Sequence, residues 1–123
     1  YNLPGIYAPI ADFTLLKTAY DVAEEKHFSV KVGNVLASDV FYNDDTTVND
    51  RWKKMGVLAV DMESAALYMT AARCRKHALT ISDHLYRGEK LSAQERQTGF
   101  TNMMETALET AVRLQNNRQM EDL

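Results

Sequence analysis

Two carboxylates, those of Asp61 and Glu63, flank a methionine directly after the apolar run of residues 57–60. An unbroken apolar run of this length is typical of a strand covered on both faces, as in a parallel sheet under helices. The carboxyl end of such a strand is where open α/β sheets bind their ligands. Acidic side chains can also stabilise the first turn of a helix, because its N–H groups are free and its dipole favours negative charge. The triplet therefore predicts either a ligand site or a helix cap.

A second polar cluster, Ser82-Asp83-His84, follows the short apolar segment of residues 77–81. The residue types suggest a hydrolase triad, but adjacent residues of a strand point to opposite faces and cannot form its relay geometry. An aspartate here is ordinarily a turn or cap residue. Arg96, in the early turn of a later helix, would ordinarily be a solvated surface residue. Taken alone, this cluster and Arg96 do not define an active site.

Helical periodicity begins at the triplet and continues to Ala72, which predicts a helix whose apolar stripe is turned toward the sheet. That stripe consists of Met62, Ala65, Ala66, Met69 and Ala72. A capping box formed by Ser92 and Glu95 opens a long final helix. Its predicted buried stripe consists of Phe100, Met103, Met104, Ala107, Ala111 and Leu114.

The remaining elements are a helix from Asp12, strands over 28–39, 57–60 and 78–81, and a short helix over 48–55. The apolar face of the first helix consists of Leu15, Leu16, Ala19, Val22 and Ala23. This order predicts an α/β fold, a three-layer α/β/α arrangement with a mixed, partly parallel sheet. With 123 residues the chain can bury one modest core, so we expect one domain over 1–123.

Composition excludes several classes of protein. The formal net charge of −3 gives no electrostatic reason for a nucleic-acid or anionic-membrane partner. No apolar run is long enough to span a bilayer, and the single cysteine, Cys74, excludes an internal disulfide and fits a reducing compartment. The three histidines have no ligand spacing, so no metal is expected. These features predict a cytoplasmic protein. A chain that begins at Tyr1 is expected to be a fragment or a processed product.

Four segments, in order, resemble motifs of the bacterial-type, hexameric purine nucleoside phosphorylases. VGNVLASDVFY is similar to the V-G-x-x-x-x-x-D-x-F-Y segment of that family, and VDMESAALY is similar to V-E-M-E-x-x-x-L/I-Y. The S-D-H and E-R-Q-T motifs follow, at residues 82–84 and 95–98. The resemblance runs from about Ala8 to Val112 and corresponds to the carboxyl-terminal half of a family subunit. It implies a partial domain of the phosphorylase/hydrolase-like fold.

The resemblance also implies the roles of particular residues. Asp83 is implied to be the general acid that protonates the purine, and Arg96 to assist it. Phe41 is implied to stack on the base, with Tyr42 as a further wall of the pocket. The residues implied to bind the nucleoside are Phe41, Val60, Asp61, Met62, Glu63 and Ser82, of which Met62 and Glu63 contact the ribose. Asp61 replaces the glutamate that is more usual in the family.

The implied reaction is the reversible phosphorolysis of purine (deoxy)ribonucleosides to free base and (deoxy)ribose 1-phosphate, a step of purine salvage. Phosphate is the co-substrate, and no other cofactor is implied. The implied assembly is a homohexamer, and the expected partners are copies of the chain or the missing amino-terminal half. Two other readings stay open: a related nucleosidase or uridine phosphorylase, and a non-catalytic nucleoside-binding or assembly module.

Two departures from the family bear on activity. The amino-terminal glycine-rich and arginine elements that hold phosphate in the family have no counterpart in these 123 residues. The family usually has about three more residues before the serine of S-D-H, and losing three strand residues displaces Asp83 by about 10 Å and reverses its face. Either the sequence omits residues there or the chain has lost its chemistry.

Overall fold

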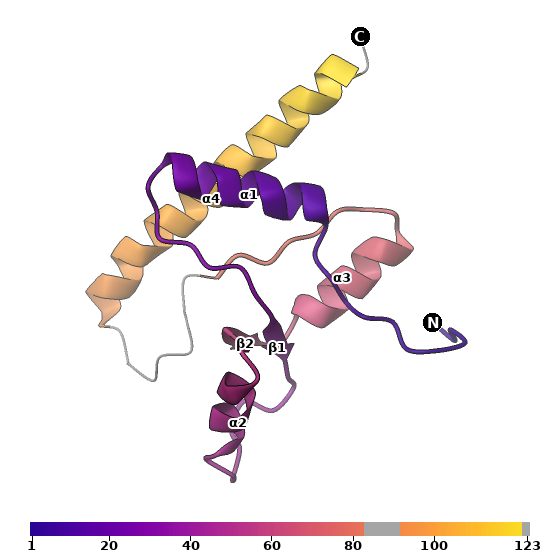
Figure 1. Cartoon of the computed structure of the whole chain (residues 1–123), viewed down its shortest axis with the longest axis vertical. Coiled ribbons are helices and arrows are strands. Elements are labelled where there is room, and N and C mark those ends of the chain that lie inside the picture. The colour runs from indigo at the N-terminus through magenta and orange to yellow at the C-terminus, as the bar shows by residue number, and fades with distance from the viewer. Residues whose placement is uncertain (83–91, 122–123) are drawn as a thin grey trace. The chain divides into compact units, whose positions relative to one another are not determined.

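The computed structural model describes residues 1–82 and 92–121, without the side chains at positions 96, 98, 99 and 118–121. Its elements are α1 (Phe13–Glu25), β1 (Val35–Ala37), α2 (Val48–Lys54), β2 (Ala59–Asp61), α3 (Ser64–Arg73) and α4 (Ala93–Glu121) (Figure 1). They form two compact units. The first comprises Tyr1–Asp12 and Gly33–Thr80, and the second comprises Phe13–Val32 and Ile81–Leu123. The helices predicted after Asp12, over 48–55, after Glu63 and after Ser92 are all present.

The sheet of the first unit consists of β1 and β2, which pair in parallel with Val35 opposite Ala59 and Ala37 opposite Asp61. A parallel pair needs a crossover between its strands, and α2 lies in the connection between β1 and β2 (Figure 1). Gly33, just before β1, lies close to Leu58, because a Cβ at this position would be 2.6 Å from the Leu58 side chain and would require that side chain to shift. The α/β class and the parallel pairing are therefore confirmed, as a partial domain. The strand predicted over 28–39 is shorter than expected.

The strand predicted over 78–81 is not formed. The Ala78 carbonyl accepts a hydrogen bond from the Asp12 N–H at 3.0 Å, and the Thr80 N–H donates to the Tyr68 hydroxyl at 2.9 Å. These backbone groups are satisfied by the segment before α1 and by α3, so this segment does not extend the ladder of β1 and β2. Apolar composition alone could not predict which partner the segment would choose.

Three helices end in the same way. After α1, α2 and α3, a residue with positive φ stops the helix: His27 (φ 56°), Gly56 (φ 78°) and Arg75 (φ 52°). In each case its N–H and the following N–H bond back to carbonyls of the last turn, which is the Schellman pattern. Val57, for example, donates to the Trp52 carbonyl at 3.3 Å. This cap fixes the direction in which the chain leaves α2 toward β2.

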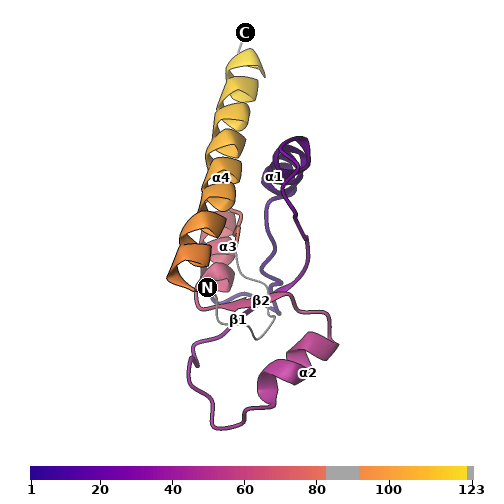
Figure 2. The ribbon, with the colours of Figure 1, turned by 90° about the vertical axis from the view of Figure 1, so that its left-hand side faces the viewer.

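The second unit is built on the packing of α1 against α4 (Figures 1 and 2). The predicted apolar face of α1 is confirmed, since Ala19, Val22 and Ala23 are buried and Val22 is fully enclosed. Arg113 of α4 forms a two-pronged ion pair with Glu25 of α1, at 2.6 and 3.0 Å.

The face of α4 that packs on α1 is not the predicted one. Its buried residues are Thr106 and Thr110, whose hydroxyls donate to the carbonyls four residues earlier, at 2.8 and 2.6 Å. A threonine whose hydroxyl forms a hydrogen bond within its own helix can be buried without leaving that hydroxyl unpaired. Much of the predicted stripe is exposed instead. Among the described side chains of α4, the large apolar ones that are exposed are Phe100 and Met104 of the predicted stripe together with Leu108 and Val112, and these residues are called here the apolar stripe of α4.

Candidate functional site

Asp61 ties the end of β2 to its neighbours. Its backbone carbonyl accepts the Ser38 N–H at 2.9 Å, just beyond β1. Its carboxylate Oδ1 accepts hydrogen bonds from the N–H and the hydroxyl of Ser64, the first residue of α3, at 3.3 and 2.8 Å. Because Ser64 is only 4% exposed, this contact replaces the water that the first turn of a helix would otherwise bind. The capping role considered for the triplet therefore belongs to Asp61.

Glu63 behaves differently, although it stands two residues away. It precedes α3 and makes no side-chain cap with that helix. Among the described residues, its Oε2 accepts a hydrogen bond from the N–H of the adjacent Met62 alone, at 3.0 Å. Both side chains are exposed, Met62 by 49% of its surface. The triplet thus separates into a structural carboxylate and an accessible carboxylate beside a thioether.

The second carboxylate oxygen of Asp61 is buried and has no hydrogen-bond partner among the described residues. Buried carboxylate oxygens in folded proteins nearly always accept a hydrogen bond, because an unpaired one has lost its water without compensation. Oδ2 of Asp61 therefore requires a donor, such as water or a group outside the described residues.

A cavity of about 490 Å³ lies in the first unit beside β1, the loop that follows it, and α2. Two residues implied to bind the nucleoside, Phe41 and Val60, line it together. Phe41 is 75% exposed and meets Tyr42 edge-on, with ring centroids 4.9 Å apart. Its lining combines aromatic and aliphatic side chains with polar groups, a combination that small-molecule sites use. The structure therefore places Phe41 and Val60 at one cavity, and their contact with a nucleoside stays a prediction.

Val60 also corrects a prediction. The run of residues 57–60 was expected to be covered on both faces, yet Val60 is 46% exposed whereas Ala59 is 8% exposed. In the unit that contains β2, no described element covers the side of the strand that carries Val60, and that side borders the cavity. The helix α3 is likewise only partly covered: Met62, Ala66 and Ala72 of its predicted stripe are exposed.

The sequence reasoning did not assign Trp52 to the pocket. Trp52, on α2, lines the cavity with Phe41 and is 41% exposed. The available signal was its position, since it is the only tryptophan of the chain and precedes by a few residues the strand that ends at the triplet.

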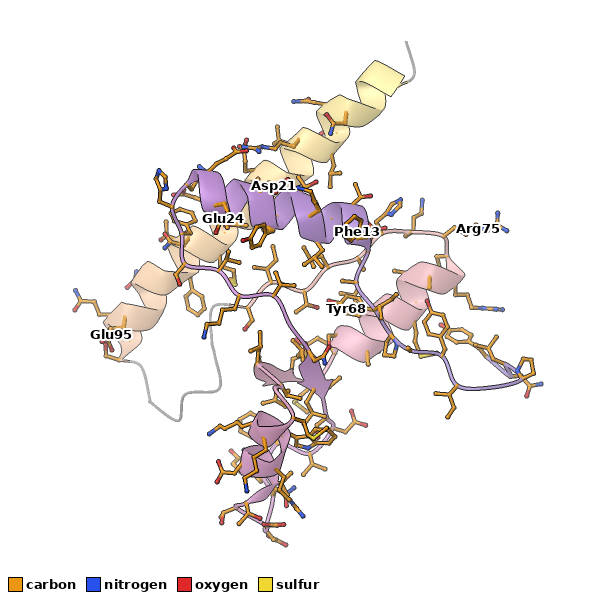
Figure 3. All side chains as sticks on the ribbon, viewed as in Figure 1. Phe13, Asp21, Glu24, Tyr68, Arg75 and Glu95 are labelled. Carbon is orange, nitrogen blue, oxygen red and sulfur yellow. The ribbon has the colours of Figure 1, made fainter. Side chains whose placement is uncertain are left out.

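The structure does not test the predicted roles of Asp83 as general acid and of Arg96 as the residue that assists it. Asp83 lies outside the described residues, as does the side chain of Arg96. Ser82 is described and belongs to the second unit. The capping box is confirmed: Glu95 Oε2 accepts the Ser92 N–H at 2.8 Å, and Ser92 Oγ accepts the Glu95 N–H at 3.2 Å. The backbone hydrogen bond from Ser92 lowers the pKa of Glu95, and Glu95 marks the first turn of α4 (Figure 3).

No cluster of metal ligands emerges from the described residues, where no three or more His, Cys, Asp or Glu side chains gather in a suitable group. Within the same part of the chain, no helix has both the length and the apolar character to cross a membrane. Cys74 is exposed just beyond α3.

The sequence that forms this α/β unit matches a known protein family. The model of the phosphorylase superfamily matches residues 1–114, and the chain belongs to this family. Proteins named purine nucleoside phosphorylase DeoD-type are similar to it. The protein of Clostridium beijerinckii is 53% identical over 113 residues, which are 89% of this chain and 48% of the relative.

Two further relatives carry the same name. The protein of Geobacillus sp. (strain WCH70) is 54% identical over 111 residues, 88% of this chain and 47% of the relative. That of Aliivibrio salmonicida is 50% identical over 111 residues, with the same coverage of both chains. The chain spans about half the length of the curated relatives that it matches.

Proposed function

We propose that the protein containing this chain is a purine nucleoside phosphorylase, which converts a purine (deoxy)ribonucleoside and phosphate into the free base and (deoxy)ribose 1-phosphate. The observation that carries the proposal is the exposed Met62–Glu63 pair at the carboxyl end of β2, in a chain about half identical to proteins of that name. The aromatic cavity around Phe41 supports it from the same unit. Phosphate is the co-substrate, and its site belongs to residues beyond the matched half.

Each residue has a distinct proposed role. Glu63 accepts hydrogen bonds from the ribose hydroxyls, and Met62 packs beneath the sugar. Phe41 stacks on the base, because a flat apolar ring replaces the water that the base sheds. Val60 and Ser82 complete the contacts with the nucleoside.

Asp83 is the proposed general acid, which protonates N7 so that the purine leaves more readily. An aspartic acid in water has a pKa of about 4 and is ionised at neutral pH. Holding the proton therefore needs burial against the base, which disfavours the carboxylate. Arg96 is proposed to approach as the proton moves and to stabilise the carboxylate that forms. A fixed Arg96 would instead oppose protonation.

The assembly and the cellular role are part of the same proposal. Copies of the subunit associate, as a hexamer, and the enzyme serves purine salvage in the cytoplasm. The exposed apolar stripe of α4 and the uncovered side of β2 at Val60 support an association of the chain with further protein.

A chimera tests the function. The part of the Clostridium beijerinckii relative that precedes the matched region is joined in front of Tyr1, and the release of hypoxanthine from inosine is measured with and without phosphate. We expect phosphate-dependent release. The relative's own full-length chain is the positive control. A second chimera with three residues inserted before Ser82 tests whether the shorter junction prevents activity.

Three results would contradict the proposal. Hypoxanthine release at the same rate with and without phosphate would indicate a nucleosidase. Preference for uridine would indicate a pyrimidine phosphorylase. Folded but inactive chimeras, with and without the insertion, would indicate a binding or assembly module.

The role of Asp83 has its own test in an active chimera. Asp83→Asn removes the transferable proton but keeps the shape, so inosine cleavage should slow by about 10²- to 10⁴-fold. A nucleoside already charged at N7, 7-methylguanosine, needs no proton and should be largely spared. Arg96→Ala should show the same selectivity in weaker form. Equal losses on both substrates would show that Asp83 only maintains the pocket.

A further inference from the structure

The cavity beside α2 contains an aromatic ring with no role in the proposed reaction. Trp52 lines the same space as Phe41, although Phe41 lies in the loop after β1 and Trp52 lies on α2, further along the same connection to β2. The position of Trp52 is fixed by the end of α2, because its carbonyl accepts the N–H groups of Met55 and Val57, at 3.0 and 3.3 Å. The ring is therefore attached to a closed turn and not to a free loop end. It is 41% exposed, so part of its surface is open to a ligand.

The chemistry of the lining favours a flat, uncharged, heteroaromatic ligand. Leu36 and Val60 add aliphatic surface, and Asn49 adds a carboxamide that can donate and accept hydrogen bonds. The one charged residue of the lining, Asp45, is already engaged: Oδ2 pairs with Arg51 at 2.7 Å, and Oδ1 accepts the N–H and hydroxyl of Thr47.

A phosphate-bearing ligand fits this lining poorly. The described lining contains no lysine or arginine, and the nearby guanidinium of Arg51 is already paired with Asp45, so the lining offers a bound anion no cation of its own. A purine base has two polarisable faces and polar edges, which match aromatic rings and a carboxamide. The volume of about 490 Å³ leaves room for such a base with sugar attached.

We propose that Trp52 is a second aromatic surface for the purine, beside Phe41, and that this cavity binds a free purine base without phosphate and without the other half of the relatives' fold. The proposal rests on the proposed function for the identity of the ligand. It goes beyond that function in assigning Trp52 to the base and in placing base binding within these 123 residues. Recognition of the base and capture of phosphate are then separable properties of the two halves.

Adenine is the probe, and the chain itself is the sample. Because Trp52 is the only tryptophan, fluorescence excited selectively at the indole reports on this one site. Adenine should change the emission of Trp52 in a saturable manner in phosphate-free buffer, while D-ribose should not. Equilibrium dialysis with labelled adenine gives the dissociation constant independently of the fluorophore.

Variants separate contact from folding. Trp52→Leu should weaken adenine binding in dialysis by about 5- to 100-fold, the effect of losing one stacking surface. Trp52→Phe keeps a ring and should stay within about threefold of the parent. Phe13→Leu is the matched control, because Phe13 is a 74% exposed aromatic at the start of α1, in the other unit (Figure 3). It should leave adenine binding unchanged.

The outcomes decide between the two proposals. If Trp52→Leu binds adenine as tightly as the parent does, with unchanged circular dichroism, the role of Trp52 is overturned. If Trp52→Leu does not fold, the Trp52→Phe variant decides the question. A loss of adenine affinity as large as that of Phe41→Leu, with unchanged circular dichroism, overturns the role of Trp52, and retained affinity supports it. No adenine binding by the parent chain overturns the inference even if the chimera is active. Adenine binding by the chain with an inactive chimera leaves this inference standing and removes the proposed function.

Discussion

At the scale of single residues, two carboxylates separated by one methionine have different environments. One carboxylate oxygen of Asp61 accepts hydrogen bonds from Ser64, and its backbone carbonyl accepts one from Ser38. Glu63 touches only the N–H of Met62 and is exposed. A carboxylate that holds two elements together is not free to follow a substrate, whereas an exposed one is. The difference separates positioning from binding within the triplet, and each role has a test.

Glu63→Ala should cost about 2–4 kcal/mol of transition-state binding in an active chimera, because a charged hydrogen-bond partner of the ribose is lost. The measurement is kcat/KM for inosine. The melting temperature should hardly move, since Glu63 makes no side-chain cap to α3. Unchanged kcat/KM with a lowered melting temperature would assign Glu63 to the fold alone.

Asp61→Asn and Asp61→Ala should differ in stability. The asparagine retains an oxygen that can accept from Ser64, so its melting temperature should stay close to that of the parent. The alanine loses the cap of α3 and should destabilise the unit by about 0.5–2 kcal/mol. Denaturant unfolding followed by circular dichroism measures both. If the Asp61→Asn variant of an active chimera is stable but inactive, the buried Oδ2 accepts a hydrogen bond from the substrate.

At the scale of elements, α1 and α4 are joined by a small apolar patch and by charges. The alanines of α1 and the self-satisfied threonines of α4 allow close packing. Beside this patch, Arg113 holds Glu25 with two hydrogen bonds and Glu109 of its own helix with one at 3.1 Å. The hydrogen bond from Arg113 lowers the pKa of Glu25 below its ordinary value of 4.5.

This lowered pKa predicts a pH dependence. A carboxyl group whose pKa is lower in the folded state stabilises the fold above its unfolded pKa, and the contribution is lost as pH falls through the folded pKa. Glu25→Gln should therefore be less stable than the parent at neutral pH, by a small amount because the pair is exposed. The difference in the free energy of unfolding between the two chains should disappear in acid, below the ordinary glutamate pKa of 4.5.

Urea unfolding of both chains across this range measures the gap. Glu24→Gln is the matched control, because the neighbouring Glu24 forms no ion pair among the described residues (Figure 3). A gap that is independent of pH would show that Glu25 acts through packing and not through its charge.

At the scale of the whole molecule, the chain leaves apolar surface uncovered. The apolar stripe of α4 recurs every fourth residue and is 38–69% exposed, and β2 is open at Val60. Surfaces of this kind in folded proteins mark contacts with other protein. The relatives are about twice as long as the matched region, so the family possesses additional chain that can cover such surface.

The chain is therefore expected to associate. In sedimentation experiments it should appear as an oligomer, and Met104→Glu with Leu108→Glu should shift it toward the monomer, because charge cannot be buried in the contact without a partner. Asn102→Glu introduces a charge on α4 outside the stripe and should have little effect. A well-folded parent that sediments as a monomer would contradict the expectation.

Local pattern by itself determined much of this molecule. The helices, the capping box of Ser92 with Glu95 and the family all follow from spacing and motifs. Such features depend on residues within one or two turns of each other, or on short apolar runs, and these interactions are readable along the chain. The role of Phe41 at the base follows only from the family motif and stays a prediction.

Tertiary structure alone decided which surfaces are covered. The buried face of α4 is the threonine face because α1 lies there, and the stripe chosen from periodicity has no such neighbour. Residues 78–81 have the composition of a strand, but their backbone groups bond to Tyr68 and Asp12. Trp52 joins Phe41 in one cavity only because the crossover through α2 brings their segments together. Burial and strand pairing depend on which segments, distant in sequence, pack against each other. Periodicity shows only that a segment has an apolar face and does not show which neighbour covers it.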